Sequence, residues 1–197
     1  QSSFLEAGAK PGLFARDDMV RQTMALYPSD FFRRLAPLVH VWGLAPLYVF
    51  LQILTGFLTL TTAYALGRAI FRSHVAGLAG VALLVAGHWT ALAGETLYSP
   101  GFTHTYAALP VAIAALALAY RRRMIPAFIV AGILFNLHAL TAAYVLLMLC
   151  AALLADWQRG DTRRWLLRAL ACGACALLLA FPTLLQMAGE RQAFGAE

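Results

Sequence analysis

The chain carries little charge. Asp, Glu, Lys and Arg make up 12% of its 197 residues, whereas 61% are hydrophobic and the mean hydropathy is +0.72. A typical soluble domain is about 25% charged and about 45–50% apolar. So little charge cannot cover a water-facing surface of normal size, which excludes a disordered chain. A nucleic-acid-binding domain is excluded for the same reason, despite the net charge of +6.

Cysteine is also scarce, and three cysteines within apolar runs exclude a disulfide-stapled secreted domain. Cys172-Gly-Ala-Cys175 has the C-x-x-C spacing, but inside an apolar run it is typical of small-residue helix packing rather than redox chemistry. The sequence also lacks a phosphate-binding glycine loop, a nucleophile elbow and a signal peptide. Because the chain begins at Gln1, we expect a fragment or a processed chain.

Long apolar runs are what the sequence does contain, and a membrane-spanning helix needs about 20 such residues. The runs are Leu35–Leu66, Val75–Ala93, Tyr106–Tyr120, Ile125–Ala155 and Leu166–Met187. Because the first run contains Pro37 and Pro46, its span is expected to start near Pro46. Leu35–Ala45 is then expected to be kinked or to lie at the interface.

The run Ile125–Ala155 is too long for one straight crossing and has Asn136, His138 and Thr141 at its centre. It is therefore either one long tilted helix or two short helices joined at Phe135–Thr141. Two helices would place the polar turn inside protein rather than against lipid.

Basic residues favour the second alternative. They gather in three loops, at Arg68 and Arg72, at Arg121–Arg123, and at Arg159, Arg163, Arg164 and Arg168. The loop Gly94–Thr105 contains no Lys or Arg, so the positive-inside rule puts it outside and the basic loops in the cytoplasm. Both ends of Ile125–Ala155 then face the cytoplasm, which requires an even number of crossings.

The predicted fold is therefore all-α, a polytopic transmembrane bundle of about six crossings in the inner (cytoplasmic) membrane. Residues 1–36 are predicted to form an extracytoplasmic loop, and residues 37–190 a single membrane domain. Seven of the nine acidic residues then lie outside, although they were not used to set the orientation.

The outer loop is predicted to end in an amphipathic surface helix that starts near Ser29. Phe31 and Leu35 are expected to face lipid there, while Arg33 and Arg34 reach phosphate headgroups.

Asp17 and Asp18 are the strongest candidates for chemistry. Two adjacent carboxylates just outside a membrane can hold a divalent cation or act as a general base. Because adjacent residues on a helix do not share a face, two ordinary solvated acids are the alternative. Arg21 follows Asp17 at the i,i+4 spacing of a helical ion pair.

Three further ionisable residues are predicted near the membrane: Glu95, His104 and His138. Ionisable residues at membrane depth are functional candidates, and polar groups at a helix break need partners. Together with His88 these residues would supply metal ligands. No close-spaced pair such as His-x-x-x-His supports a metal site, so none is assigned.

Carboxylates at the outer rim of the bundle would lie beside a lipid-linked phosphate. They would activate an acceptor hydroxyl while Arg21 or Arg33 pairs with the phosphate. His104 and His138 are the other candidate substrate-binding or phosphate-binding residues.

The segment 119–144 resembles a stretch of the bacterial C-type (GT-C) membrane glycosyltransferases. In these, an Arg-rich turn precedes a short Ala- and Gly-rich helix, a polar break and a returning helix. The segment 95–106 looks like the outer loop before that unit, and Asp17-Asp18 is similar to an acidic motif of the first outer loop. The resemblance implies an N-terminal fragment that lacks the first membrane helix.

The same resemblance implies inverting transfer of a sugar from a polyprenyl-phosphate donor. Asp17 or Asp18 would be the base, and Glu95 the second acidic position. The expected partners are membrane lipids and a lipid-linked sugar donor, with no nucleic acid. The alternatives are a non-enzymatic transporter or assembly subunit, and an inactive fragment of a larger membrane enzyme.

Overall fold

The computed structural model describes residues 31–87, 102–157 and 161–194, and of residues 32–34 and 189–194 only the backbone. Within these ranges the chain forms seven helices and no strand, as the all-α prediction requires. They are α3 (Phe31–Trp42), α4 (Leu44–Phe71), α5 (His74–Ala86), α6 (His104–Tyr120), α7 (Met124–Leu137), α8 (Ala139–Trp157) and α9 (Thr162–Phe194).

Three of these helices are long and apolar enough to cross a membrane: α4 with 28 residues, α8 with 19, and Thr162–Ala188 of α9 with 27. At about 1.5 Å per residue, α8 is close to the roughly 30 Å of a hydrocarbon core and the other two helices are longer than it. The apolar helices α5, α6 and α7 have only 13, 17 and 14 residues. Three of the described helices are therefore candidate spans by length and composition, and the count of six crossings stays a prediction.

Apolar side chains also cover the outside of these helices. Phe57 on α4 is 65% exposed, Leu147 on α8 is 69% exposed, and Leu178 on α9 is 75% exposed. A helix that is apolar all round belongs in a protein core or in lipid. Since these side chains lie outside the core, the bundle has the surface of a membrane protein.

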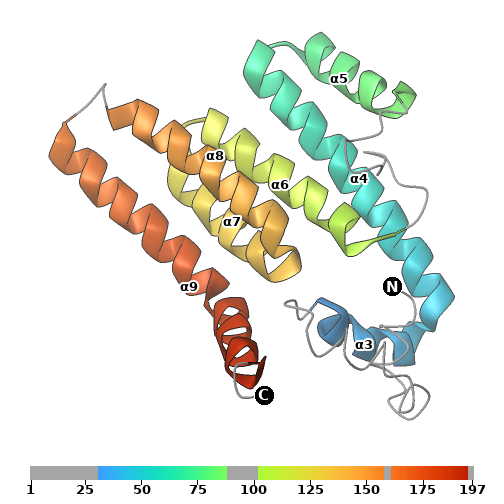
Figure 1. Ribbon diagram of the computed structural model, residues 1–197. Helices are drawn as coiled ribbons and strands as arrows, with labels where there is room; N and C mark the ends of the chain where they lie inside the picture. Colours follow the sequence, from blue (N-terminus) through green and yellow to red (C-terminus); the bar gives the residue numbers. More distant parts are fainter. Residues whose placement is uncertain (1–30, 88–101, 158–160, 195–197) are drawn as a thin grey trace.

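The first apolar run contains two helices rather than one. α3 ends at Trp42 and α4 begins at Leu44, with Gly43 between them at φ +79°, a conformation that glycine adopts without strain. In Figure 1, α3 lies across the end of the bundle while α4 runs along it. The expected division of this run is thus confirmed, with the break at Gly43, so that Leu44 and Ala45 belong to the long helix rather than to the segment before it.

The run Ile125–Ala155 is likewise divided. α7 ends at Leu137, His138 has an extended backbone, and α8 begins at Ala139. The two helices then pack against each other. The two-helix interpretation is therefore confirmed, with the break inside the predicted segment.

α6 is the centre of the bundle, packing on α4 on one side and on α7 and α8 on the other (Figure 1). α5 packs on the outside of α4, and α9 packs on α7. The core between α6 and its neighbours is rich in alanine, including Ala108, Ala115, Ala127 and Ala131, each fully buried. Small side chains let helix backbones approach closely, the mode of packing that works without a hydrophobic driving force.

The ends of α4, α6 and α8 meet at one end of the bundle, which we call the basic end. There the Tyr120 hydroxyl donates to the Ile70 carbonyl at 3.2 Å, and Arg122 forms an ion pair with Asp156. The Trp165 ring nitrogen donates to the Leu153 carbonyl at 2.7 Å. These contacts bring the start of α9 and the turns that hold Arg72 and Arg121–Arg123 to one end, as the charge pattern predicts.

Candidate functional site

The starts of α6 and α8 lie at the opposite end, which we call the histidine end. His104 is the first residue of α6, whose N-cap Thr103 accepts a hydrogen bond from the Tyr106 amide at 3.0 Å. His138 lies between α7 and α8. The two imidazole rings are stacked, with centroids 5.0 Å apart and planes 22° apart. Two residues that the sequence separates widely are thus neighbours.

His138 also caps α8. Its Nδ1 accepts the backbone N–H of Thr141 at 3.2 Å, and the Thr141 hydroxyl lies 2.9 Å from the same nitrogen. Because a backbone N–H can only donate, Nδ1 must be unprotonated to accept it. The neutral ring that satisfies this contact carries its proton on Nε2. The break between α7 and α8 leaves backbone N–H groups at the start of α8 without helical partners, and His138 accepts a hydrogen bond from one of them.

Asn136 joins α7 to α9. Its side-chain amide nitrogen donates to the Gly132 carbonyl at 3.2 Å and to the Leu179 carbonyl at 2.7 Å. Its amide oxygen accepts the Thr183 hydroxyl at 2.8 Å. One side chain thus holds α9 on both sides of Pro182.

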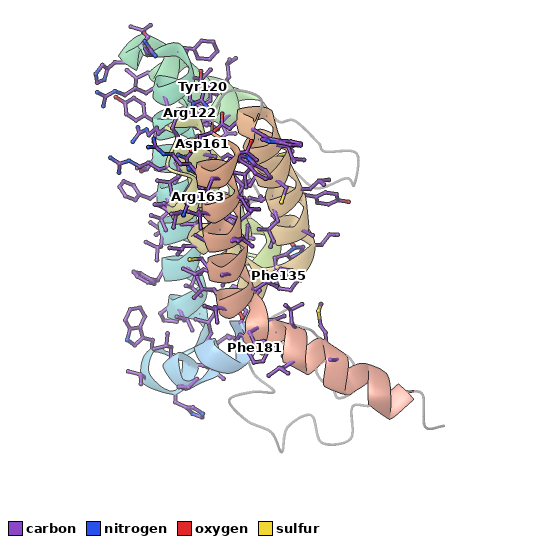
Figure 2. The ribbon with its side chains drawn as sticks, turned by 90° about the vertical axis from the view of Figure 1, so that its left-hand side faces the viewer. Tyr120, Arg122, Phe135, Asp161, Arg163 and Phe181 are labelled. Carbon is purple, nitrogen blue, oxygen red and sulfur yellow. The ribbon has the colours of Figure 1, made fainter. Side chains whose placement is uncertain are left out.

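Pro182 explains why α9 needs this support. Proline has no N–H for the carbonyl four residues earlier, and its ring clashes with that carbonyl, so a helix bends there. Figure 2 shows α9 turning away from its upper course near Phe181. The carbonyl that loses its partner is that of Leu178, and Asn136 bonds to the next one, Leu179, so it ties the bent turn of α9 to α7 rather than replacing the lost bond.

A cavity of about 510 Å³ lies beside this junction, between α3, α7 and α9. Its lining is apolar except for Asn136, and consists of Phe31, Leu35, Ile133, Asn136, Leu137, Leu178, Leu179 and Pro182. A hollow of this kind, with apolar walls and one amide, suits a ligand with a hydrocarbon part and a polar part.

Aromatic contacts fix α3 over this end. The ring of buried Phe102, just before α6, lies 6.0 Å from the Phe31 ring on α3 and 5.7 Å from the Tyr48 ring on α4. Phe31 and Leu35 are half-buried and line the cavity. α3 therefore turns both side chains toward the bundle, and the expectation that they face lipid stays a prediction.

The predicted site residues divide into two groups. His104 and His138 are brought together. Asp17, Asp18, Arg21 and Glu95 lie outside the described residues, and Arg33 lies on α3 with its side chain also outside them. Among the side chains that are described, no three of His, Cys, Asp and Glu are close enough to hold a metal ion.

Thr183 is a residue of the site that the sequence argument misses. Its signal is a polar side chain directly after a proline within an apolar run, which marks a bend that needs hydrogen-bond partners.

Comparison with protein-family models, curated proteins and solved structures finds no match to this chain. Over its described residues the chain is all-helical, with three helices long and apolar enough to cross a membrane.

Proposed function

We propose that the chain is an integral membrane protein that transfers a sugar from a polyprenyl-phosphate donor at the extracytoplasmic face. The observation that supports this function best is the cavity of about 510 Å³ at the histidine end. Its apolar walls suit a prenyl chain, and its single amide lies two residues from His138.

In the proposed transfer, acidic residues activate the acceptor and arginines stabilise the leaving phosphate. A carboxylate of Asp17 or Asp18 takes the proton of an acceptor hydroxyl as the hydroxyl oxygen bonds to the anomeric carbon. The bond between that carbon and the phosphate oxygen breaks, and the polyprenyl phosphate leaves with the bonding electrons. Glu95 is the second acidic position, and Arg21 and Arg33 stabilise the departing phosphate.

The stacked histidines lie at the same end of the bundle as the proposed donor cavity. The neutral form of His138 that accepts the Thr141 amide carries its proton on Nε2. An imidazole N–H donates to a phosphate or sugar oxygen without adding a buried charge, which would be costly among apolar helices.

The test is sugar transfer from a labelled polyprenyl-phosphate donor in isolated membranes. Asp17→Asn, Asp18→Asn and the double variant are each compared with the wild-type chain. Glu6→Gln is the matched control, because it removes one acid from the same N-terminal region. We expect transfer to fall by about 100-fold or more in the variant that lacks the base, since general-base catalysis contributes about 10²–10⁴-fold. Glu6→Gln is expected to stay active.

Transfer that survives the double substitution would contradict the catalytic assignment. A wild-type chain that transfers no sugar would instead favour the alternatives, a non-enzymatic transporter or assembly subunit or an inactive fragment of a larger enzyme.

A further inference from the structure

A second and larger cavity, of about 940 Å³, lies at the basic end. α4 and α8 both pack on α6 and far less on each other, which leaves a hollow between them. Leu66 of α4, Leu116 of α6 and Met148 of α8 supply its apolar walls.

Arginines form the rim of this cavity. Arg72 ends α4, and Arg121 and Arg122 form the turn after α6. Arg122 is paired with Asp156 of α8. Within the described part of the chain, Arg72 and Arg121 have no such carboxylate and both are exposed. The cavity therefore combines apolar walls with two cations that no acid neutralises there.

The backbone at this rim is unusual. Arg72 has φ +52° and Arg122 has φ +63°, and among described residues they are the non-glycine positions with positive φ. Glycine adopts this conformation without strain and is the usual residue after a helix end. Strained backbone positions concentrate at ligand-binding sites, and both of these lie on the rim of one cavity.

We propose that this cavity binds an anionic phospholipid, with its phosphate between Arg72 and Arg121 and its acyl chains against α4 and α8. The guanidinium group matches phosphate geometry with paired hydrogen bonds. Arginines at a membrane surface attract anionic lipids, and the adjoining walls take the hydrocarbon. The site lies at the end opposite to the proposed donor cavity and does not depend on it.

The experiment measures binding of fluorescent phosphatidylglycerol and phosphatidylcholine to the purified chain in neutral detergent. We expect the wild-type chain to prefer phosphatidylglycerol. The double variant Arg72→Gly/Arg121→Gln should remove this preference. Each lost arginine should weaken the affinity for phosphatidylglycerol by about five-fold. Because glycine suits the φ of Arg72, that part of the variant should keep its fold, which circular dichroism checks.

Matched controls separate this site from general surface charge. Arg68→Gln with Arg163→Gln removes two exposed arginines near the same end that do not line the cavity, and it should keep the preference. Ala152→Phe fills the cavity from α8 without changing charge and should weaken phosphatidylglycerol binding. If the arginine variant does not fold, Ala152→Phe still tests whether the cavity binds phosphatidylglycerol.

The proposal fails if the wild-type chain binds both lipids equally or if the control pair loses as much affinity as the rim pair. Unchanged binding in Ala152→Phe would also overturn it. Displacement of the lipid by excess inorganic phosphate would identify a free-anion site instead.

Discussion

The two ends of the bundle are held together by different interactions. At the histidine end, neutral side chains bond to each other and to backbone carbonyls, as Asn136 does with Leu179 and Thr183. At the basic end, neutral bonds such as that of Tyr120 to the Ile70 carbonyl are joined by an ion pair between Arg122, in the turn after α6, and Asp156 of α8; the arginine is 67% exposed and the aspartate 16%. The described ion pair between helices thus lies at the basic end, whose arginines are exposed, whereas the bonds of Asn136 at the histidine end are uncharged.

This difference implies a difference in energy. A neutral hydrogen bond between packed helices has no water to replace a lost partner, whereas an exposed ion pair does. Substitutions at the histidine end should therefore destabilise the fold more than substitutions at the basic end. Four variants test this comparison, each measured by unfolding in detergent micelles.

Gly132→Ala should have the largest effect. A Cβ atom there would lie 2.8 Å from the Ala176 carbonyl oxygen and 2.9 Å from the Leu179 Cβ, so α7 and α9 would have to separate. Overpacking of this kind costs about 1–3 kcal/mol in the free energy of unfolding. Gly173→Ala on α9 is the control, since its Cβ would meet no atom within 4 Å. Equal stability of the two variants would refute the close α7–α9 contact.

Asn136→Leu should follow, with a loss of about 1–2 kcal/mol because it removes every bond between this side chain and α9. Thr183→Val removes only the bond to the Asn136 amide oxygen and should cost less. If Thr183→Val were as damaging as Asn136→Leu, the carbonyl of Leu179 would not be the main partner.

His138→Ala should cost about 1 kcal/mol through loss of the N-cap of α8. His138→Asn keeps a side-chain acceptor at the cap position and should restore most of that stability. If His138→Asn is stable but loses sugar transfer, the imidazole has a role in the chemistry as well as in the fold. If His138→Ala is as stable as the wild-type chain, the cap assignment is wrong.

Asp156→Asn should have the smallest effect, below about 1 kcal/mol, because the ion pair that it breaks is largely exposed on the arginine side. Any loss should shrink further as salt concentration rises. A loss larger than that of Asn136→Leu would reverse the comparison between the two ends.

Much of this architecture follows from the sequence. The polar residues 136–141 predict the break between α7 and α8, because a membrane helix tolerates such residues where helices can satisfy them. The arginine pattern predicts which turns share one end of the bundle. Pro37 and Pro46 predict that the first apolar run is divided, but both lie inside helices and the junction itself is Gly43.

The pairing of helices does not follow from the sequence. α4, α6, α7 and α9 are apolar over most of their surface, so no stripe marks the face that packs. The contact of α9 with α7 depends instead on single residues: Gly132 allows the close approach, and Asn136 bonds to α9 beside Pro182. The sequence alone does not show that these residues are neighbours. The stacking of His104 on His138 is missed for the same reason, because neither residue has a ligand-like spacing to the other.

The central claim is that the histidine end holds the lipid-linked donor. Its most direct test is photo-crosslinking with a polyprenyl phosphate that carries a diazirine in its chain, followed by peptide mapping. We expect labels on the lining of the smaller cavity, at Ile133 of α7 and Leu178 of α9. Labels confined to α4 and α8 at the basic end, or no label at all, would contradict it.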